Sequence, residues 1–251
     1  MQFIQEIQNV LETIQREEKD TIRQAVKACA ASIKAGRAVL LFGAGHSALP
    51  PQEAFPRIGS IAGFVQITEP VFGFNGFVTG KGGQRQMSFL EGTAGFAEVI
   101  LSNYMLSPED TLIVFSNSGI NALPVELCWL AKARGLTTIS VGSRAHALAN
   151  QPKNPLGQRL LDVSDIHIDN HTPVGDTLIT LNGGLRTGGS STIAGMVIMN
   201  MIVVETIREL QGAGVDVTVY PSHNVSGDLA TVEAQENAVL QAHRDLLAKL
   251  Q

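Results

Sequence analysis

The sequence has 251 residues, of which 44% are hydrophobic and 16% are charged, and its formal net charge at pH 7 is −5. This length suffices for one large buried core, and the acidic balance disfavours nucleic acid as a partner, because a phosphate backbone is bound by basic surfaces. The longest apolar run, residues 195–204, is well short of the roughly 20 residues that cross a bilayer, so we expect no membrane association.

The first 35 residues show helical periodicity. Apolar side chains recur three or four positions apart from Phe3 to Ile14 and from Ile22 to Ile33, which predicts one long helix or two ending before Gly36. We expect this segment to pack on the core or on another subunit. Its first residues lack the basic start and continuous apolar stretch of a signal peptide, so the expected location is the cytoplasm.

The two cysteines, Cys29 and Cys128, lie in segments that also read as helix. A free cysteine packs as a small hydrophobic residue, so both are expected in the core. Two thiols without a C-x-x-C pattern predict no disulfide framework.

Strands and helices alternate through the middle of the chain. Predicted strands cover residues 37–42, 64–68, 111–115 and 136–142, with short candidates at 166–168 and 176–181, and predicted helices cover 86–105, 120–134, 190–211 and 228–250. Continuous apolar strands separated by helices predict an α/β fold with a parallel sheet covered on both faces. Ligands of such sheets bind beyond the carboxyl ends of the strands.

Two stretches have no clear periodicity and are rich in turn-forming residues, 69–85 and 143–158. Both are expected to be ordered functional loops or mobile flaps. Neither an internal repeat nor a linker is visible, so we predict a single domain over 1–251. It divides into an N-terminal helical segment (1–35), a core (36–210) and a C-terminal segment (211–251).

The turn after the first predicted strand resembles a dinucleotide-binding turn. Residues 43–48, Gly-Ala-Gly-His-Ser-Ala, fit the pattern G-x-G-x-x-A, and Glu69 follows the second strand where such proteins hold a ribose. Pro50 and Pro51 argue against this interpretation, because proline beyond the first turn of a helix removes a backbone bond and clashes. At a later helix start proline is well tolerated. We therefore expect a loop in which Ser47 offers a hydroxyl, with a dinucleotide site or a plain tight turn as alternatives.

The strand at 111–115 is followed by Ser116-Asn117-Ser118-Gly119 and then by a helix. The first N–H groups of a helix lack internal partners and carry the positive end of its dipole, so small polar side chains there form an anion site. The motif has no P-loop lysine, which favours a phosphate monoester over a triphosphate held with magnesium. Plain capping of the helix by Ser118 or Asn121 is the alternative.

These motifs, in this order, resemble the SIS (sugar isomerase) phosphosugar-binding domain family over residues 36–210. The family includes phosphoheptose isomerase, the isomerase half of glucosamine-6-phosphate synthase and N-acetylmuramic acid 6-phosphate etherase. The chain looks closest to stand-alone bacterial sugar-isomerase-domain proteins. The motifs that carry this likeness are His46-Ser47, Ser116–Gly119, Asp169-Asn170 with Pro173-Val174-Gly175-Asp176, and His223-Asn224.

The resemblance implies a three-layer αβα sandwich with a five-stranded parallel sheet, here with a long N-terminal helical extension. It also implies a homodimer or homotetramer with sites at or near subunit interfaces, and it implies that Ser47 and Ser116 to Ser118 bind a sugar phosphate. Many members carry Thr where this chain has Asn121. The full set of candidate phosphate- or sugar-binding residues is Gly45, His46, Ser47, Ser116, Asn117, Ser118, Gly119, Asn121 and Asn170.

Aldose–ketose isomerisation needs a base beside C1 and C2, and the candidates are few. Glu91 stands in a Glu-Gly-Thr setting similar to that of the etherase's catalytic glutamate, Glu53 follows the Gly-Ala-Gly turn, and Glu69 follows a strand end. His223 precedes the last helix, and phosphosugar isomerases of this family often supply a histidine from a second subunit. Each of these residues has a structural alternative: a helix-dipole contact, a salt bridge or a solvated surface position.

Other polar residues carry weaker signals. Asp169, Asn170 and Asp176 could hold sugar hydroxyls or close a turn, and residues 190–192, Ser-Ser-Thr, could cap a helix or line the pocket. The acidic and histidine residues show no metal-ligand spacing, so neither a metal nor another cofactor is expected.

The sequence thus predicts a phosphosugar-binding protein that acts as an aldose–ketose isomerase, with Glu91 as base and with His223 and Glu53 as further catalytic candidates. A non-catalytic sugar-phosphate sensor or regulator is one alternative, and a sugar-phosphate lyase or etherase is another.

Overall fold

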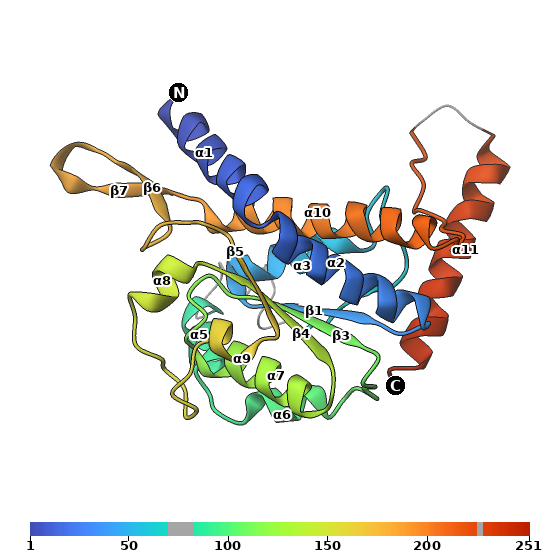
Figure 1. Cartoon of the computed structure of the whole chain (residues 1–251), viewed down its shortest axis with the longest axis horizontal. Helices are drawn as coiled ribbons and strands as arrows, with labels where there is room; N and C mark the ends of the chain where they lie inside the picture. The colour runs from blue at the N-terminus through green and yellow to red at the C-terminus, as the bar shows by residue number, and fades with distance from the viewer. Residues whose placement is uncertain (70–82, 225–227) are drawn as a thin grey trace.

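The computed structural model describes residues 1–69, 83–224 and 228–251. Its centre is a five-stranded sheet in the order β2-β1-β3-β4-β5, and every neighbouring pair of strands in it is parallel (Figure 1). The strands are β1 (Val39–Gly43), β2 (Phe64–Gln66), β3 (Thr111–Phe115), β4 (Thr137–Gly142) and β5 (Ile166–Asp169). The predicted α/β fold with a five-stranded parallel sheet is confirmed.

Helices cover both faces of this sheet, because successive strand residues point to opposite sides. One apolar core joins one set of strand residues to α1 (Gln2–Glu17), α2 (Lys19–Lys34), α3 (Leu49–Ala54) and α10 (Ser191–Gly212). A second core joins the alternate set to α5 (Gly83–Glu91), α6 (Phe96–Leu101), α7 (Ala122–Ala133) and α9 (Leu160–Val163). The central strands β1 and β3 are buried along their whole length because each contributes to both cores.

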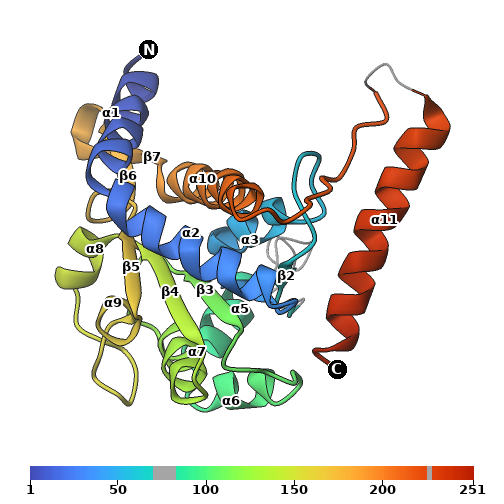
Figure 2. The same ribbon diagram turned by 45° about the vertical axis from the view of Figure 1, so that its right-hand side comes forward.

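The first helix and the last helix lie at opposite sides of this sandwich (Figure 2). The predicted helical segment forms the two helices α1 and α2, which meet at Glu18, and α2 contributes Ile22, Val26 and Cys29 to the first core. The last helix, α11 (Leu229–Ala248), runs along the far side of the molecule from α1 (Figure 2). Among the described residues, none of the helices is both long and apolar enough to cross a membrane.

A buried ion pair fixes the amino-terminal edge of the sheet. Arg37 donates from Nε and Nη2 to the two carboxylate oxygens of Asp110, at 3.0 and 2.6 Å. Asp110, which is 1% exposed, also accepts from the backbone N–H groups of Ala38 and Ser107. These bonds tie the starts of β1 and β3 together at the end opposite the predicted site.

The structure corrects several predicted elements. The segment at 176–181 does not enter the sheet: β6 (Thr177–Thr180) pairs with β7 (Arg186–Gly189) in an antiparallel hairpin that projects beside α1 (Figure 1). The strand β7 was not among the predicted elements. The helix expected over 86–105 is interrupted between Glu91 and Phe96, and α8 (Arg144–Leu148) forms inside the segment read as a loop at 143–158. Most of the predicted loop at 69–85 lies outside the described residues.

Candidate functional site

A narrow cleft lies where β1, β3 and β4 end and where α10 begins. Its walls lie close together, and the cavity volume between them is about 10 Å³, room for about one water molecule. Polar side chains from four separate segments line it, together with apolar residues of the sheet and of α3. The lining residues are Ser47, Pro50, Phe115, Ser116, Asn117, Val141, Asn170, Ser191, Thr192 and Gly195.

The Gly-Ala-Gly turn brings Ser47 to this cleft. A Cβ atom at Gly43 would lie 1.9 Å from the carbonyl oxygen of Ser47, so only glycine allows the chain to fold back so closely after β1. Residues Gly45–Ala48 then form a single 3₁₀ turn, and α3 follows with proline in its first turn, where the missing N–H costs no hydrogen bond. The prediction that the helix starts late, beyond the glycine motif, is confirmed. His46 in this turn is exposed.

The Ser-Asn-Ser-Gly loop forms the second wall. The backbone N–H of Ser116 donates to Val141 of the neighbouring strand, and its hydroxyl oxygen accepts from the N–H of Gly119 at 3.2 Å. Gly119 has φ +59°, a conformation that favours glycine. At Gly142 a Cβ atom would lie 2.2 Å from the carbonyl oxygen of Ser116. The loop therefore packs directly against the end of β4.

A hydrogen-bonded network orients the side chain of Asn117. Its Oδ1 accepts from Nδ2 of Asn170 at 2.9 Å and from the hydroxyl of Thr172 at 3.0 Å. Asn170 and Thr172 are 3% and 1% exposed, and Oδ1 of Asn170 accepts from the hydroxyl and the N–H of Thr172. Because the amide oxygen of Asn117 already has donors, its NH₂ group is the end that can donate to an anion in the cleft.

The start of α10 forms the third wall. Both carboxylate oxygens of Asp176 are used: Oδ1 accepts from the N–H and hydroxyl of Ser190 and from the N–H of Ser191, and Oδ2 accepts from the Ser191 hydroxyl at 2.6 Å. Asp176 therefore caps the helix from the base of the β6–β7 hairpin. Gly195 lets α10 approach α3, since a Cβ atom there would lie 2.9 Å from Cγ of Pro50.

Glu91 lies beside the second wall, at the end of α5. Its carboxyl group is hydrogen-bonded to the side chain of Asn121, the N-cap residue of α7, and burial raises the pKa of the Glu91 carboxyl above its usual value despite this bond. Asn121 thus uses its side chain on Glu91 and leaves the first N–H groups of α7 without a side-chain cap. Ser118 and Gly119 lie between Asn121 and the cleft-lining Asn117 in sequence.

The other candidate acids and histidines lie elsewhere. Glu53, on α3, pairs at 2.7 Å with Arg57, which follows that helix. His223 lies 3.1 Å from the carboxylate of Glu236 on α11. Neither is among the residues that line the cleft. Burial raises the pKa of Glu69, whose charge in turn helps to raise the pKa of the half-buried Tyr104.

Several residues of the site carry no clear sequence signal. Contacts between segments distant in sequence require Gly142, Thr172 and Gly195. The sequence indicated Pro50 only as a residue at a helix start. Ser191 and Thr192, which the sequence left open as helix caps or pocket residues, line the cleft. Within 1–69, 83–224 and 228–251, three or more His, Cys, Asp or Glu side chains do not gather into a group that could hold a metal ion.

A larger groove lies between α2 and α10, away from the strand ends, with a volume of about 550 Å³. Its cationic lining residues are Lys19, Arg23, Lys27 and Arg208. It is open and is shaped by long side chains on two helix surfaces, whereas the cleft is formed by backbone turns and buried hydrogen bonds. The cleft is therefore the better candidate for a specific small ligand.

Comparisons with known proteins agree with this geometry. The sequence model of the SIS domain matches residues 2–143, more than half of the chain. A UPF0309 protein of Geobacillus thermodenitrificans is 30% identical over 228 residues, which are 90% of this chain and 89% of the relative. A UPF0309 protein of Brucella ovis is 32% identical over 210 residues, covering 82% of this chain and 81% of the relative.

Two solved structures share the fold. A phosphoheptose isomerase from Neisseria gonorrhoeae superposes with a TM-score of 0.54 at 13% identity, over 82% of this chain and 95% of the other. A phosphoheptose isomerase from Francisella tularensis gives a TM-score of 0.51 at 15% identity, with the same coverage of both chains. At these identities the likeness concerns the fold alone.

Proposed function

The chain belongs to the SIS domain family, and from that premise we propose that it binds a phosphorylated sugar and isomerises it between aldose and ketose forms. The observation that carries this proposal is the convergence of Ser47, Ser116, Asn117 and Ser191 on one cleft at the carboxyl ends of the strands. Isomerisation by proton transfer between C1 and C2 needs a base and no cofactor. The proposed place of action is the cytoplasm.

The cleft suits a monophosphate because of the donors that line it. The hydroxyls of Ser47, Ser116 and Thr192 and the Asn117 amide can donate to phosphate oxygens, whereas the Ser190 and Ser191 donors at the start of α10 already bind Asp176. Among the described residues, those that line the cleft include neither Lys nor Arg. Recognition would therefore rest on placed hydrogen bonds rather than on net charge.

The relatives supply the substrate class. The two superposed proteins are named as phosphoheptose isomerases, which supports a sugar phosphate as the ligand of this chain as well. The proposed set of phosphate- and sugar-binding residues includes those that line the cleft and their neighbours in the two turns. The neighbours are Gly45, His46, Ser118, Gly119 and Asn121.

Glu91 is the proposed base. It lies beyond Asn121 at the edge of the phosphate loop, so a sugar held by its phosphate in the cleft could extend its reacting carbons toward this carboxylate. Burial raises the Glu91 pKa, which brings it closer to the operating pH and makes the carboxylate a better proton acceptor. His223 and Glu53 would act only through a second subunit or a rearrangement, because each is paired away from the cleft.

Removing the Glu91 carboxylate tests this assignment. In Glu91→Gln we expect proton exchange at C2 of a hexose or heptose phosphate to slow by about 10²- to 10⁴-fold, while affinity for the sugar phosphate is retained. Glu98→Gln is the matched control, since Glu98 is an exposed acid on α6 that pairs with Arg134. An unchanged exchange rate in Glu91→Gln contradicts its role as base.

Binding without turnover is the second candidate, because none of the three catalytic candidates, Glu91 included, is among the residues that line the cleft. Proton exchange at C2 in the wild-type chain distinguishes isomerisation from binding without turnover. Thermal stabilisation by a sugar phosphate, with no proton exchange at C2 in the wild-type chain, assigns a sensor or regulator. Elimination of a C3 substituent instead of exchange would assign a lyase or etherase.

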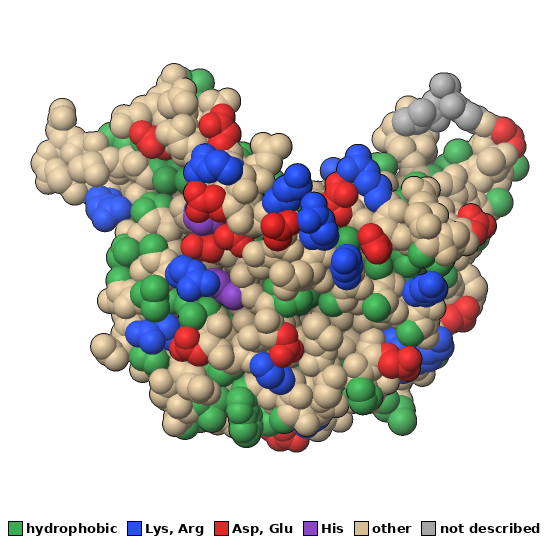
Figure 3. All heavy atoms as spheres, viewed as in Figure 1, with side chains coloured by type: hydrophobic (Ala, Val, Ile, Leu, Met, Phe, Trp, Pro, Cys, Tyr) green, Lys and Arg blue, Asp and Glu red, His purple; other side chains and the backbone are tan. Residues whose placement is uncertain are grey.

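A homodimer or homotetramer is the proposed assembly, and the outer face of α10 supports it. Along this face Ile193 and Val204 are 37% and 45% exposed, and grooves of about 550 and 560 Å³ run on either side of the helix. A ridge between two grooves is the shape that packs against a copy of itself about a two-fold axis. Positive and negative side chains alternate over α2 and α10 (Figure 3), as a self-complementary surface requires.

A further inference from the structure

The loop after β5 holds an unfavourable backbone conformation next to the cleft. His171 has φ +51°, in the left-handed region that residues with a side chain rarely adopt and that persists only where surrounding contacts impose it. Its neighbours Asn170 and Thr172 are the two residues that hold the Asn117 side chain. The contacts that impose the conformation of His171 therefore also affect how the Asn117 side chain is held in the Ser-Asn-Ser-Gly loop.

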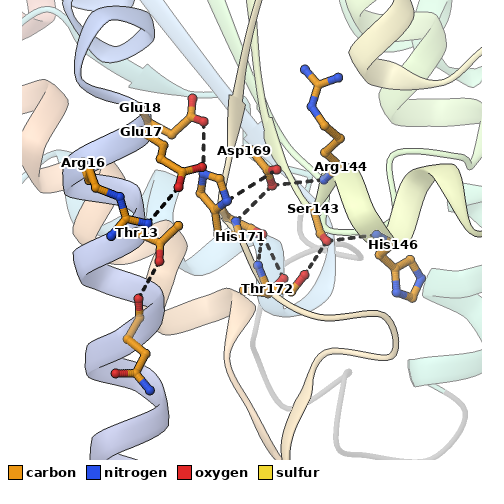
Figure 4. Close-up of polar contacts among 12 residues, drawn as sticks. Thr13, Arg16, Glu17, Glu18, Ser143, Arg144, His146, Asp169, His171 and Thr172 are labelled. Carbon is orange, nitrogen blue, oxygen red and sulfur yellow. Dashed lines mark hydrogen bonds and ion pairs between the residues drawn. The ribbon is translucent and has the colours of Figure 1, made fainter.

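Two carboxylates from distant segments hold the imidazole of His171 (Figure 4). On one side, Nε2 lies 3.1 Å from Oε1 of Glu18, whose side chain is 12% exposed. On the other side, Nδ1 lies 3.7 Å from Oδ2 of Asp169, while Oδ1 of Asp169 accepts from the backbone N–H of His171 at 3.0 Å. Asp169 also accepts from the N–H of Arg144, which fixes it to the start of α8.

Glu18 is placed to act as an anchor because it joins two helices. It ends α1, with its N–H donating to Ile14, and it starts α2, with its carbonyl accepting from the N–H of Ile22. Both Ile14 and Ile22 are buried in the first core. The Glu18 carboxylate is therefore held by the packing of the whole N-terminal helix pair, and it cannot follow a loop that moves.

The orientation of the Asn117 amide depends on this loop. With Asn170 and Thr172 in place, Oδ1 of Asn117 has donors and the NH₂ group can donate to an anion. If the loop relaxes, the amide loses those donors and can turn its oxygen toward the cleft, where it would repel a phosphate oxygen. One side-chain rotation thus converts a phosphate donor into a phosphate-repelling group.

We propose that Glu18 and His171 are positioning residues, through which the N-terminal helix pair holds Asn170 and Thr172 and so keeps the Asn117 amide turned to donate to phosphate. That phosphate is the ligand rests on the proposed function. The conformation of the loop can be measured without any ligand.

The test titrates the full chain with inorganic phosphate. In His171→Ala we expect phosphate affinity to fall about fivefold, which corresponds to the loss of roughly one hydrogen bond. His171→Gln keeps an N–H donor for Glu18, so we expect its phosphate affinity to stay within about twofold of wild type. Glu18→Ala should match His171→Ala, and the double variant should lose no more than either, because both act through one contact. Glu12→Gln is the control, since Glu12 is an exposed acid on the same helix α1.

The side-chain amide signal of Asn117 in NMR spectra separates positioning from general stability. We expect this signal to shift in His171→Ala and Glu18→Ala and to return in His171→Gln, whatever the change in unfolding free energy. Additive losses in the double variant, or unchanged affinity in a folded His171→Ala chain, would overturn the proposal.

If the wild-type chain binds no phosphate, the proposed function fails and hydrogen exchange decides the positioning role alone. The N–H of Thr172, which donates to Oδ1 of Asn170, should exchange about tenfold faster in His171→Ala than in wild type or His171→Gln. Equal exchange in all three would show that His171 does not hold the loop.

Discussion

At the residue scale, the site depends on glycines that the sequence does not identify as functional. The serines of the two turns were predictable because each follows an apolar strand, and strand ends are where a parallel sheet binds ligands. Gly142 was not predictable, since the atom that excludes a side chain there is the carbonyl of Ser116, on another strand. Thr172 was hidden for the same reason, because its partner Asn117 lies 55 positions away.

Gly142→Ala tests this close approach. The added Cβ would lie 2.2 Å from the carbonyl oxygen of Ser116, so the loop or the end of β4 must shift. We expect a loss of about 1–3 kcal/mol in the free energy of unfolding, with weaker phosphate binding because Ser116 and Asn117 move. Gly183→Ala is the control at an open site with nothing within 4 Å, although its positive φ also strains alanine. Urea unfolding of both variants measures the difference, and an equal loss in both would contradict the contact.

A buried histidine of β5 gives a pH dependence at the same scale. Burial lowers the pKa of His167 to about 4 from the usual 6.5, while Nδ1 is bonded to the Ser140 hydroxyl at 2.8 Å. The unfolded chain therefore takes up the proton first, so the free energy of unfolding decreases as the pH falls from about 6.5 to about 4, by up to roughly 3 kcal/mol. In His167→Asn this part of the decrease should be absent from unfolding curves measured between pH 7 and pH 4.5. An identical slope in both proteins would show that His167 is not the group responsible.

At the element scale, long apolar elements were predictable and short polar ones were not. The strands of the sheet and helices α7, α10 and α11 lie close to their expected positions, because burial on one or both faces imposes a clear period. The β6–β7 hairpin was missed, although its Asn182-Gly183 tip is a common hairpin signal, because the glycines of β7 conceal the alternation. Asp176 lies at the base of this hairpin. The sequence predicted that it holds sugar hydroxyls or closes a turn, and in the structure it caps α10.

Replacing Asp176 tests the link between this hairpin and the cleft. In Asp176→Ala the first turn of α10 loses its cap, which we expect to cost about 1–2 kcal/mol of unfolding free energy, and phosphate affinity should fall because Thr192, which lines the cleft from that turn, is no longer held in place. Asp228→Ala removes the cap of α11, which bonds to Thr231, and should lower stability with no change in affinity. Equal phosphate affinity in the two variants would show that the hairpin does not contribute to phosphate binding.

At the scale of the whole molecule, the layers and the order of strands follow from the alternation of strands and helices, but the outer surface of α10 does not. This helix is apolar on nearly every side, so from sequence it is indistinguishable from a fully buried one. The structure buries only part of it. We expect Val204→Lys to shift the chain toward monomer in light scattering, while Lys27→Glu, at the edge of the same surface, should weaken assembly less. A wild-type monomer at micromolar concentration would contradict the proposed assembly.

The most direct measurement is a crystal structure of the chain soaked with a hexose 6-phosphate. The account predicts the phosphorus atom in the cleft, with its oxygens within hydrogen-bonding distance of Ser47, Ser116 and Thr192 and with the sugar extending toward Glu91. A phosphate found instead among Lys19, Arg23 and Lys27 in the groove between α2 and α10, with the cleft empty, would contradict it.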